Sequence, residues 1–296
     1  MQYDVAVIGA GPAGLQAAIH ASRKKVSVVV FGKPSNSAMS GTHVENYFAV
    51  TGNADGDDMI SAGLSQAKEF GCDLVELNVT SAEPSGTGFT IRTEDDASYE
   101  VKSVVIATGI SRKKLGVPGE KEFFGKGVSY CAVCDCNFYR GRVVAVVGND
   151  TEAAVSAEVM THYASKTYWV ADDIGASDIA KNKALDAGAV LLTSQVDRIE
   201  GEARVARIVL KDGSSVDVDG VFIELGAKSA ADLALDLGVM PEMDDTIKVG
   251  RDCGTEVPGV FACGDVTGKP WQVAKAVGEG CVAGMGAADH AKGVTE

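Results

Sequence analysis

The middle of the chain carries two cysteines separated by two residues and followed at once by a carboxylate, in the order Cys131-Ala132-Val133-Cys134-Asp135. Cysteines at this spacing can close a small disulfide that opens and recloses, and the spacing commonly lowers the pKa of one thiol towards neutrality. Asp135 would then lie within reach of the leaving thiolate as a proton donor. The same spacing also occurs as half of a zinc site, so the pair alone leaves both chemistries open.

A glycine-rich turn near the N-terminus predicts a dinucleotide site. An apolar run at 5–8 ends in Gly9-Ala10-Gly11-Pro12-Ala13-Gly14, and a helical pattern to about residue 23 and a second strand at 26–31 follow. In such a strand–turn–helix unit the first glycine permits the tight turn, the second lets the backbone approach a pyrophosphate, and the third lets the helix pack on the strand. The helix N-terminus offers free N–H groups to that pyrophosphate. One part of the fingerprint is missing, because the second strand ends in Phe31-Gly32-Lys33 and not in an acid.

The elements that position these motifs follow from the apolar periodicity. Residues 58–70 have the spacing of an amphipathic helix, and 89–92 and 99–106 read as strands, the second ending in Ala107-Thr108-Gly109. Gly116-Val117-Pro118-Gly119 is typical of a linker. A second unit of the dinucleotide type follows, with a strand at 143–147, a turn at 148–151, a helix at 152–163 and a strand at 167–170. A strand at 260–265 ending in Gly-Asp and a helix from about 272 to 290 complete the chain.

Composition narrows the class of protein. The chain has 296 residues, which favours two domains, and 41 acidic against 27 basic residues give a net charge of −14. No basic stripe for nucleic acid is visible, and the acidity disfavours anionic membrane surfaces. No apolar run reaches the ~18 residues of a membrane span, and no signal peptide is recognisable, so we expect a cytoplasmic protein. In a reducing compartment Cys72, Cys253, Cys263 and Cys281 should be buried thiols.

Two dinucleotide-type units with a CxxC just before the second resemble the low-molecular-weight thioredoxin reductase family of FAD-dependent disulfide reductases. Further markers are 44–47 (Val-Glu-Asn-Tyr), 138–141 (Phe-Tyr-Arg-Gly) and 264–266 (Gly-Asp-Val). The resemblance covers essentially the whole chain. It implies an α/β fold of two Rossmann-like, three-layer domains, the second inserted into the first. Residues 1–112 and 240–296 would form the FAD-binding domain, and 113–239 the inserted NAD(P)-type domain that carries the CxxC.

The resemblance also implies roles for individual residues. Cys134 would be the sulfur next to the flavin, Cys131 the thiol that attacks a thioredoxin-like partner protein, and Asp135 the acid that protonates the leaving thiolate. Asn46 and Asp265 would contact the flavin chain, and Gln272 and Val273 would approach the isoalloxazine ring. The expected cofactor-binding residues are Gly9, Gly11, Pro12, Ala13, Gly14, Gly32, Lys33, Asn46, Val79, Ala107, Thr108, Gly109, Gly264, Asp265, Gln272 and Val273. The family further implies a homodimer that alternates between two domain orientations.

The second dinucleotide motif departs from the family pattern. Asp150 stands where its second glycine should be, and the strand after it leads into Ala171-Asp172-Asp173, where relatives that use NADPH carry a His-Arg-Arg cluster. Acids facing a 2′-phosphate repel it, whereas a bidentate arginine would attract it. The sequence therefore argues against NADPH. NADH stays open, because Asp172 could accept a hydrogen bond from a 2′-hydroxyl, although Asp150 argues against it too.

The remaining departures from the family's sequence pattern concern the surroundings of the flavin, which bear on the electron donor, and Cys136. Trp271 replaces the arginine usual before the glutamine, and 34–42 lacks the Gly-Gly-Gln usual beside the flavin. Together with 148–151 and 272–278, these features are similar to a branch of the family that draws electrons from reduced deazaflavin coenzyme or ferredoxin. An NADH-dependent disulfide reductase with another acceptor, and a flavin-binding redox sensor with little turnover, are the alternatives. Cys136 could be an inert small residue, a redox thiol or part of a metal site, but its surroundings in sequence lack a fourth ligand, so we expect no metal.

Overall fold

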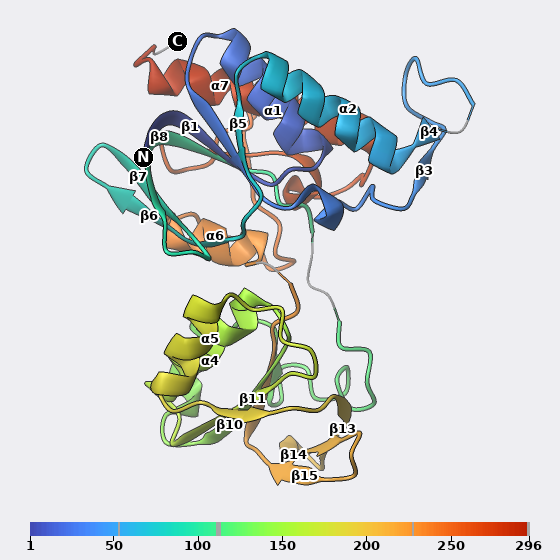
Figure 1. The fold of residues 1–296 in the computed structure, drawn as a ribbon, viewed down its shortest axis with the longest axis vertical. Coiled ribbons are helices and arrows are strands. Elements are labelled where there is room, and N and C mark those ends of the chain that lie inside the picture. Colours follow the sequence, from blue (N-terminus) through green and yellow to red (C-terminus); the bar gives the residue numbers. More distant parts are fainter. Residues whose placement is uncertain (53, 111–113, 227, 295–296) are drawn as a thin grey trace. The chain divides into compact units, whose positions relative to one another are not determined.

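The computed structural model describes residues 1–52, 54–110, 114–226 and 228–294, without the side chains of Val133 and Cys134. The chain divides into two compact units, which Figure 1 draws as ribbons. Unit 1 consists of residues 1–111 and 228–296, and unit 2 of residues 112–227. Unit 2 is therefore inserted into unit 1 in the order of the chain.

Unit 1 contains a mixed sheet. Its strands run in the order β5-β2-β1-β8-β7-β6, with β17 also paired to β8. They are β1 (Gln2–Ile8), β2 (Val28–Phe31), β5 (Asp73–Val75), β6 (Val79–Ser85), β7 (Gly88–Thr93), β8 (Ser98–Ile106) and β17 (Val260–Ala262). Strands β5, β2, β1, β8 and β17 are parallel to their neighbours in this series, and the β6–β7–β8 part is antiparallel. The central parallel strands are continuous apolar runs, as expected for strands buried on both faces.

Helices cover one face of this sheet, where α1 (Pro12–Arg23), α2 (Gly56–Glu69) and α7 (Val273–Ala291) lie together (Figure 1). On the opposite face, side chains of the parallel strands pack with α6 (Ala230–Asp236) and with side chains of the β6–β7 hairpin, whose antiparallel strands continue the same sheet. Unit 1 also contains the short strand pair β3 (His43–Val44) and β4 (Ala54–Asp55) and the 3₁₀ turns η1 (Pro34–Asn36) and η3 (Gly264–Thr267). The Asp55 carboxylate accepts from the amides of Asp57 and Asp58, so α2 begins with a side-chain cap.

Unit 2 contains a parallel sheet with the strand order β12-β11-β10-β16-β9. The strands are β9 (Val128–Ser129), β10 (Val143–Val147), β11 (Lys166–Val170), β12 (Val190–Leu192) and β16 (Gly220–Ile223), and the helices are α3 (Ala132–Asp135), η2 (Cys136–Tyr139), α4 (Thr151–Thr161) and α5 (Asp178–Asp186). Helices α4 and α5 cover one face (Figure 1). A small antiparallel sheet of β13 (Val196–Gly201), β14 (Val205–Leu210) and β15 (Ser215–Asp217) covers the other.

The predicted fold class is confirmed, since each unit has a central sheet with parallel strands between two covering layers. The second boundary was predicted at 239/240, whereas residues 228–239 belong to unit 1. The reason is the apolar face of α6, where Leu233 and Ala234 pack with the sheet of unit 1. No sequence motif marks that packing.

Residues 116–119, which were predicted to be a linker, are packed within unit 2. This segment belongs to unit 2, where Ile199 donates a backbone hydrogen bond to the Pro118 carbonyl and the buried Glu120 carboxylate accepts from the amides of Leu115 and Gly116. The proline and glycines here shape a turn within the unit. Among the helices of the described residues, none combines the length and the apolar character needed to cross a bilayer.

Candidate functional site

The expected cofactor residues of unit 1 converge at the carboxyl edge of its parallel strands. The Gly9 amide donates to the Phe31 carbonyl at 2.8 Å, and the Ala107 amide donates to the Ile8 carbonyl at 2.8 Å. The Cys263 amide donates to the Ile106 carbonyl at 3.0 Å. These bonds tie together the segments that leave β2, β1, β8 and β17. The carboxyl edge of a parallel sheet is where dinucleotides bind in folds of this type.

Close backbone contacts explain two of the glycines in this edge. Gly9 has φ +123°, and a Cβ there would lie 2.2 Å from the Ala107 carbonyl oxygen. A Cβ on Gly14 would lie 1.9 Å from the Gly9 carbonyl oxygen. Any side chain at either position would force the turn, β8 and α1 apart. Gly11 differs, because it caps α1 and its Cβ position is open except for the Ser37 hydroxyl at 3.5 Å, which leaves the backbone accessible to a ligand.

Two polar groups at this edge have unused hydrogen-bonding capacity. The Thr108 hydroxyl is buried and has no partner in the described part of the protein. The half-buried Asp265 carboxylate receives no hydrogen bond from any described residue, and burial raises its pKa. Buried polar groups normally find a partner, so a missing partner at an open edge fits a ligand-binding role.

The remaining expected residues belong to other segments of unit 1. The Asn46 amide donates to the Gln272 side-chain oxygen at 2.9 Å, so these two residues are in contact although they lie far apart in sequence. Gln272 caps the N-terminus of α7 and Val273 is its first residue. Val79 is buried at the start of β6.

Lys33, directly after the positive-φ Gly32, forms an ion pair of 3.1 Å with Glu94. Glu94 is buried and also accepts from the Asn78 amide. The acid that the fingerprint usually carries at the end of β2 is thus absent, but a carboxylate from the β7–β8 turn lies beside that position. No motif in the sequence points to this partner.

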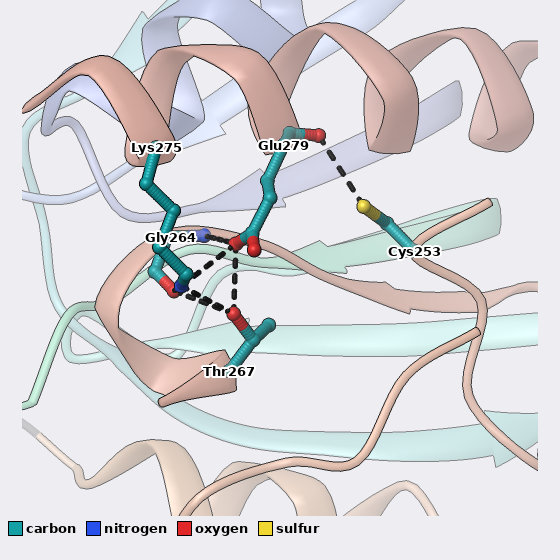
Figure 2. A network of polar contacts seen from close by, with 5 residues as sticks. All are labelled: Cys253, Gly264, Thr267, Lys275 and Glu279. Atoms are coloured by element: carbon teal, nitrogen blue, oxygen red, sulfur yellow. Dashed lines mark hydrogen bonds and ion pairs between the residues drawn. The ribbon is translucent and has the colours of Figure 1, made fainter. Parts of the chain in front are cut away.

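Sequence reasoning also missed a group of polar residues below the Gly264–Thr267 turn. Lys275 and Glu279, one turn apart on α7, hydrogen-bond to Gly264 and Thr267 (Figure 2). The only signal available in sequence was the lysine–glutamate spacing of four on a predicted helix, which usually marks a solvent-exposed pair.

Cys131 lies in unit 2 directly after β9 and before the short helix α3. It is disulfide-bonded, and its residue is 5% exposed. The Cys131 amide donates to the Ser129 hydroxyl at 3.1 Å, and the next amide, of Ala132, donates to the Glu224 carboxylate at 2.9 Å. The Cys134 side chain lies outside the described residues. Asp135 is half-buried, and its amide donates to the Cys131 carbonyl at 3.4 Å.

A cavity of about 780 Å³ lies at the carboxyl ends of β10 and β11 in unit 2. Its lining includes Asn149, Asp150 and Asp172. The Asp172 carboxylate accepts hydrogen bonds from the side chains of Gln195 and Asn149, the latter at 2.8 Å, and these bonds lower the pKa of Asp172. Asp172 is therefore ionised at neutral pH, but the charges that line the cavity are mixed, because Lys114 and Lys211 line it together with Asp150, Asp172 and Asp197.

The other cysteines separate into buried and accessible thiols. Cys72, Cys136, Cys253 and Cys263 are buried, and burial raises the pKa of Cys253 to about 11. Cys281 was predicted to be buried but is only partly so, and its sulfur lies 3.7 Å from His20 Nδ1. Among the residues whose side chains are described, no three metal-ligating groups gather at one point.

Unit 1 has a dinucleotide-binding motif at the carboxyl edge of its parallel strands, and unit 2 has a disulfide next to its own parallel sheet. Together these two features define a dinucleotide-dependent disulfide oxidoreductase. The sequence profile of the pyridine nucleotide-disulphide oxidoreductases matches residues 3–280. A thioredoxin reductase of Listeria innocua is 34% identical over 307 residues, which cover 99% of this chain and 95% of the relative. The chain belongs to this family, and within it to the low-molecular-weight thioredoxin reductases.

Two solved structures are similar over nearly their whole length. The atypical thioredoxin reductase of Desulfovibrio vulgaris Hildenborough has a TM-score of 0.84 and 33% identity, with 98% of each chain covered. A ferredoxin-flavin thioredoxin reductase of Clostridium acetobutylicum has a TM-score of 0.68 and 33% identity, with 97% of each chain covered.

Low-molecular-weight thioredoxin reductases are FAD-binding flavoproteins, and the cofactor of this chain is FAD. The carboxyl edge of unit 1 fits that group. Gly9 and Gly14 keep the turn close to the sheet, Gly11 leaves the backbone open, and Thr108 and Asp265 hold unused hydrogen-bonding capacity. The geometry therefore agrees with the dinucleotide motif identified in the sequence.

Proposed function

We propose that this protein is a thioredoxin reductase-like flavoenzyme that reduces the disulfide of a thioredoxin-like protein, with electrons from reduced deazaflavin coenzyme or ferredoxin and not from NADPH. The disulfide at Cys131, in a chain 34% identical to a thioredoxin reductase, is the observation that carries the reductase part. FAD, bound at the edge of unit 1, supplies two-electron chemistry between the donor and the disulfide.

The chemistry of the chain itself is thiol–disulfide exchange. Two electrons and two protons convert the Cys131–Cys134 disulfide into two thiols. The Cys131 thiolate then attacks the partner disulfide, forms a mixed disulfide and releases one partner thiolate, which Asp135 protonates. The Cys134 thiolate attacks the Cys131 sulfur, which re-forms the disulfide and releases the partner in its dithiol form. The surroundings of Cys131 support this role, because Ser129 and Glu224 hold the backbone on both sides of its carbonyl.

The cavity of unit 2 supports a donor other than NADPH. Lys114 and Lys211 also line this cavity, but Asp150 and Asp172 occupy the positions of the second dinucleotide motif, and Asp172 is ionised and held by Asn149 and Gln195. A 2′-phosphate carries about two negative charges near neutral pH, so it would meet repulsion where a guanidinium would attract it. The similarity to a protein described as a ferredoxin-flavin thioredoxin reductase supports ferredoxin as one candidate.

The donor is tested by an anaerobic titration of the purified flavoprotein with NADPH, NADH, reduced deazaflavin coenzyme and reduced ferredoxin in turn. We expect the flavin absorbance band to bleach with one of the last two donors. Bleaching by stoichiometric NADPH would overturn the donor assignment. Bleaching by NADH alone would favour the second candidate, an NADH-dependent reductase, for which Asp172 could accept from a ribose hydroxyl at the end of β11.

The reductase part is tested separately, with dithionite as the electron source and a thioredoxin-like protein as acceptor. Cys131→Ser and Cys134→Ser should abolish transfer to the acceptor, whereas Cys281→Ser, which removes a half-buried thiol of unit 1, should leave it unchanged. Transfer that persists in both active-site variants would contradict the proposal. A homodimer is expected from the family, and light scattering of the purified protein tests it.

A further inference from the structure

A partly buried ion pair on α7 holds the Gly264–Thr267 turn. The Lys275 ammonium lies 3.1 Å from the Glu279 carboxylate, and the two side chains are 16% and 25% exposed. The Glu279 carboxylate accepts from the Gly264 amide at 2.9 Å and from the Thr267 hydroxyl at 2.7 Å. The Lys275 ammonium donates to the Gly264 carbonyl at 2.8 Å and is 2.7 Å from the Thr267 hydroxyl (Figure 2).

This arrangement fixes the turn from two sides. Gly264 presents its amide to one member of the pair and its carbonyl to the other, so neither group can move without breaking a bond. The turn also lies against the start of α1, since a Cβ on Gly264, where φ is +85°, would be 2.8 Å from the Ala13 Cβ. The ion pair therefore sets the separation between the first turn of α1, the Gly264–Thr267 turn and α7.

Asp265 lies inside the turn that the ion pair holds. Its half-buried carboxylate receives no hydrogen bond from the described residues, so burial and the neighbouring charges determine its pKa. Burial raises the pKa of Asp265, the nearby Lys275 ammonium lowers it, and the Glu279 carboxylate raises it. The neighbouring thiols Cys253 and Cys263 are buried with raised pKa values and stay neutral. Asp265 is thus influenced by one cation and one anion, both of which belong to the pair.

We propose that Lys275 and Glu279 are positioning residues for FAD, which hold Asp265 at the cofactor edge through their hydrogen bonds to Gly264 and Thr267. The inference rests on the proposed function, because it assumes that Asp265 accepts a hydrogen bond from the FAD chain. Neither Lys275 nor Glu279 needs to touch the cofactor. Their effect is transmitted through the backbone of Gly264 and through the field at Asp265.

Lys275 and Glu279 both hold the Gly264–Thr267 turn in place, but they have opposite effects on the pKa of Asp265. Removing either loses hydrogen bonds to the turn, so both changes should weaken FAD binding. Removing the cation raises the pKa of Asp265 further, whereas removing the anion lowers it. A carboxylate accepts a hydrogen bond better than a carboxylic acid, so FAD affinity should fall as pH drops through the pKa of Asp265. The midpoint of that fall should move up in pH in one variant and down in the other.

The experiment measures the dissociation constant of FAD by flavin fluorescence in the full-length apoprotein, from acidic to neutral pH. We expect Lys275→Met to weaken binding about tenfold at neutral pH, equivalent to about 1.4 kcal/mol, and to raise the midpoint of the pH dependence. Glu279→Gln should weaken binding less and lower the midpoint. The double variant should bind weakly with a midpoint close to that of the unchanged protein, because both charges are gone.

Lys248→Met serves as the matched control, since Lys248 is an exposed lysine of the same unit, and should leave affinity and midpoint unchanged. Asp265→Asn should remove the pH dependence. If Lys275→Met does not fold, the proposal is still tested by Glu279→Gln, because the midpoint of the pH dependence of FAD affinity should shift to lower pH in that variant. Unchanged affinity and midpoint in both single variants, with normal binding in the parent, would overturn the positioning role alone. A parent apoprotein that binds no FAD would instead overturn the proposed function.

Discussion

At the scale of single residues, Glu224 places a carboxylate one peptide bond away from Cys131. Its oxygen accepts from the Ala132 amide at 2.9 Å, and the residue is 7% exposed. An ionised carboxylate beside a cysteine disfavours the thiolate, and so disfavours the reduced pair to the extent that it is ionised. Glu224 should therefore make the disulfide harder to reduce.

Glu224→Gln keeps an oxygen acceptor for the Ala132 amide and removes the charge. We expect the equilibrium with dithiothreitol to shift towards the dithiol, and a tenfold shift corresponds to about 30 mV. Titration in redox buffers with a thiol label read by mass spectrometry measures the shift. Glu224→Ala, which also removes the acceptor, should cost about 1–3 kcal/mol of stability in unit 2. An unchanged potential in Glu224→Gln would rule out the electrostatic role.

Thr108 offers a second prediction at this scale, because its buried hydroxyl has no partner among the described residues. Thr108→Val removes the hydroxyl at nearly constant volume. The apoprotein should lose no stability, whereas FAD affinity should fall by a factor of about 5 to 10, equivalent to the ~1 kcal/mol of one hydrogen bond. Thr167 in unit 2 also has a buried hydroxyl without a described partner, so Thr167→Val is the matched control. Equal FAD affinity in the unchanged protein, in Thr108→Val and in Thr167→Val would contradict a role for Thr108 in binding FAD.

At the scale of elements, α7 and α1 pack at backbone distance. A Cβ on Gly284 would lie 2.1 Å from the Ala17 carbonyl oxygen, so the two helices can approach only because the position is glycine. Gly280 is similar, with its Cβ position 2.2 Å from the Ala13 carbonyl oxygen. This packing brings the first residues of α7 to the same edge as the turn between β1 and α1, and so the element contact determines the geometry of the cofactor site.

Gly284→Ala should separate α7 from α1 and destabilise unit 1 by about 1–3 kcal/mol, because overpacking a close contact forces backbone movement. Gly278 on the same helix has no atom within 4 Å of its Cβ position. Gly278→Ala should therefore stabilise the protein by about 0.5–1 kcal/mol through the better helix propensity of alanine. Urea denaturation followed by circular dichroism measures both changes, and equal effects of the two substitutions would contradict the packing argument.

At the scale of the whole molecule, each unit has its own apolar clusters. Val7 and Val30 belong to a cluster of unit 1, and Met160 and Phe222 to one of unit 2. Units with separate cores can unfold in separate steps, and a ligand stabilises the unit that binds it.

Calorimetry should accordingly show two transitions. FAD at about 100 times its dissociation constant should stabilise only the transition of unit 1, by about 2.7 kcal/mol. Met160→Ala, which truncates a fully buried side chain in unit 2, should lower only the other transition, by about 2–5 kcal/mol. A single transition that shifts with both changes would show that the units unfold together.

Local patterns were sufficient to predict much of the fold. The parallel strands β1, β2 and β10 read as apolar runs, and each ends in the structure at the expected residue. The glycines at positions 9 and 14 were assigned from spacing, and their close backbone contacts are what the motif requires. Such features depend on residues within one strand–turn–helix unit, where spacing along the chain determines position in space. The roles of Cys134, Asp135 and the electron donor remain predictions.

Contacts between distant segments could be decided only by the tertiary structure. Glu224 and Ala132 are separated by 92 positions, and nothing near either residue marks the other. The lysine–glutamate pair on α7 is visible in sequence, but its burial below the Gly264–Thr267 turn follows from how α7 packs on α1. The membership of residues 228–239 in unit 1 likewise depends on the sheet face that α6 covers. Sequence by itself therefore determined the dinucleotide edge and the CxxC, because spacing encodes local geometry. Only the tertiary structure decided which charges face them, because burial and the choice of partner are set by packing between elements.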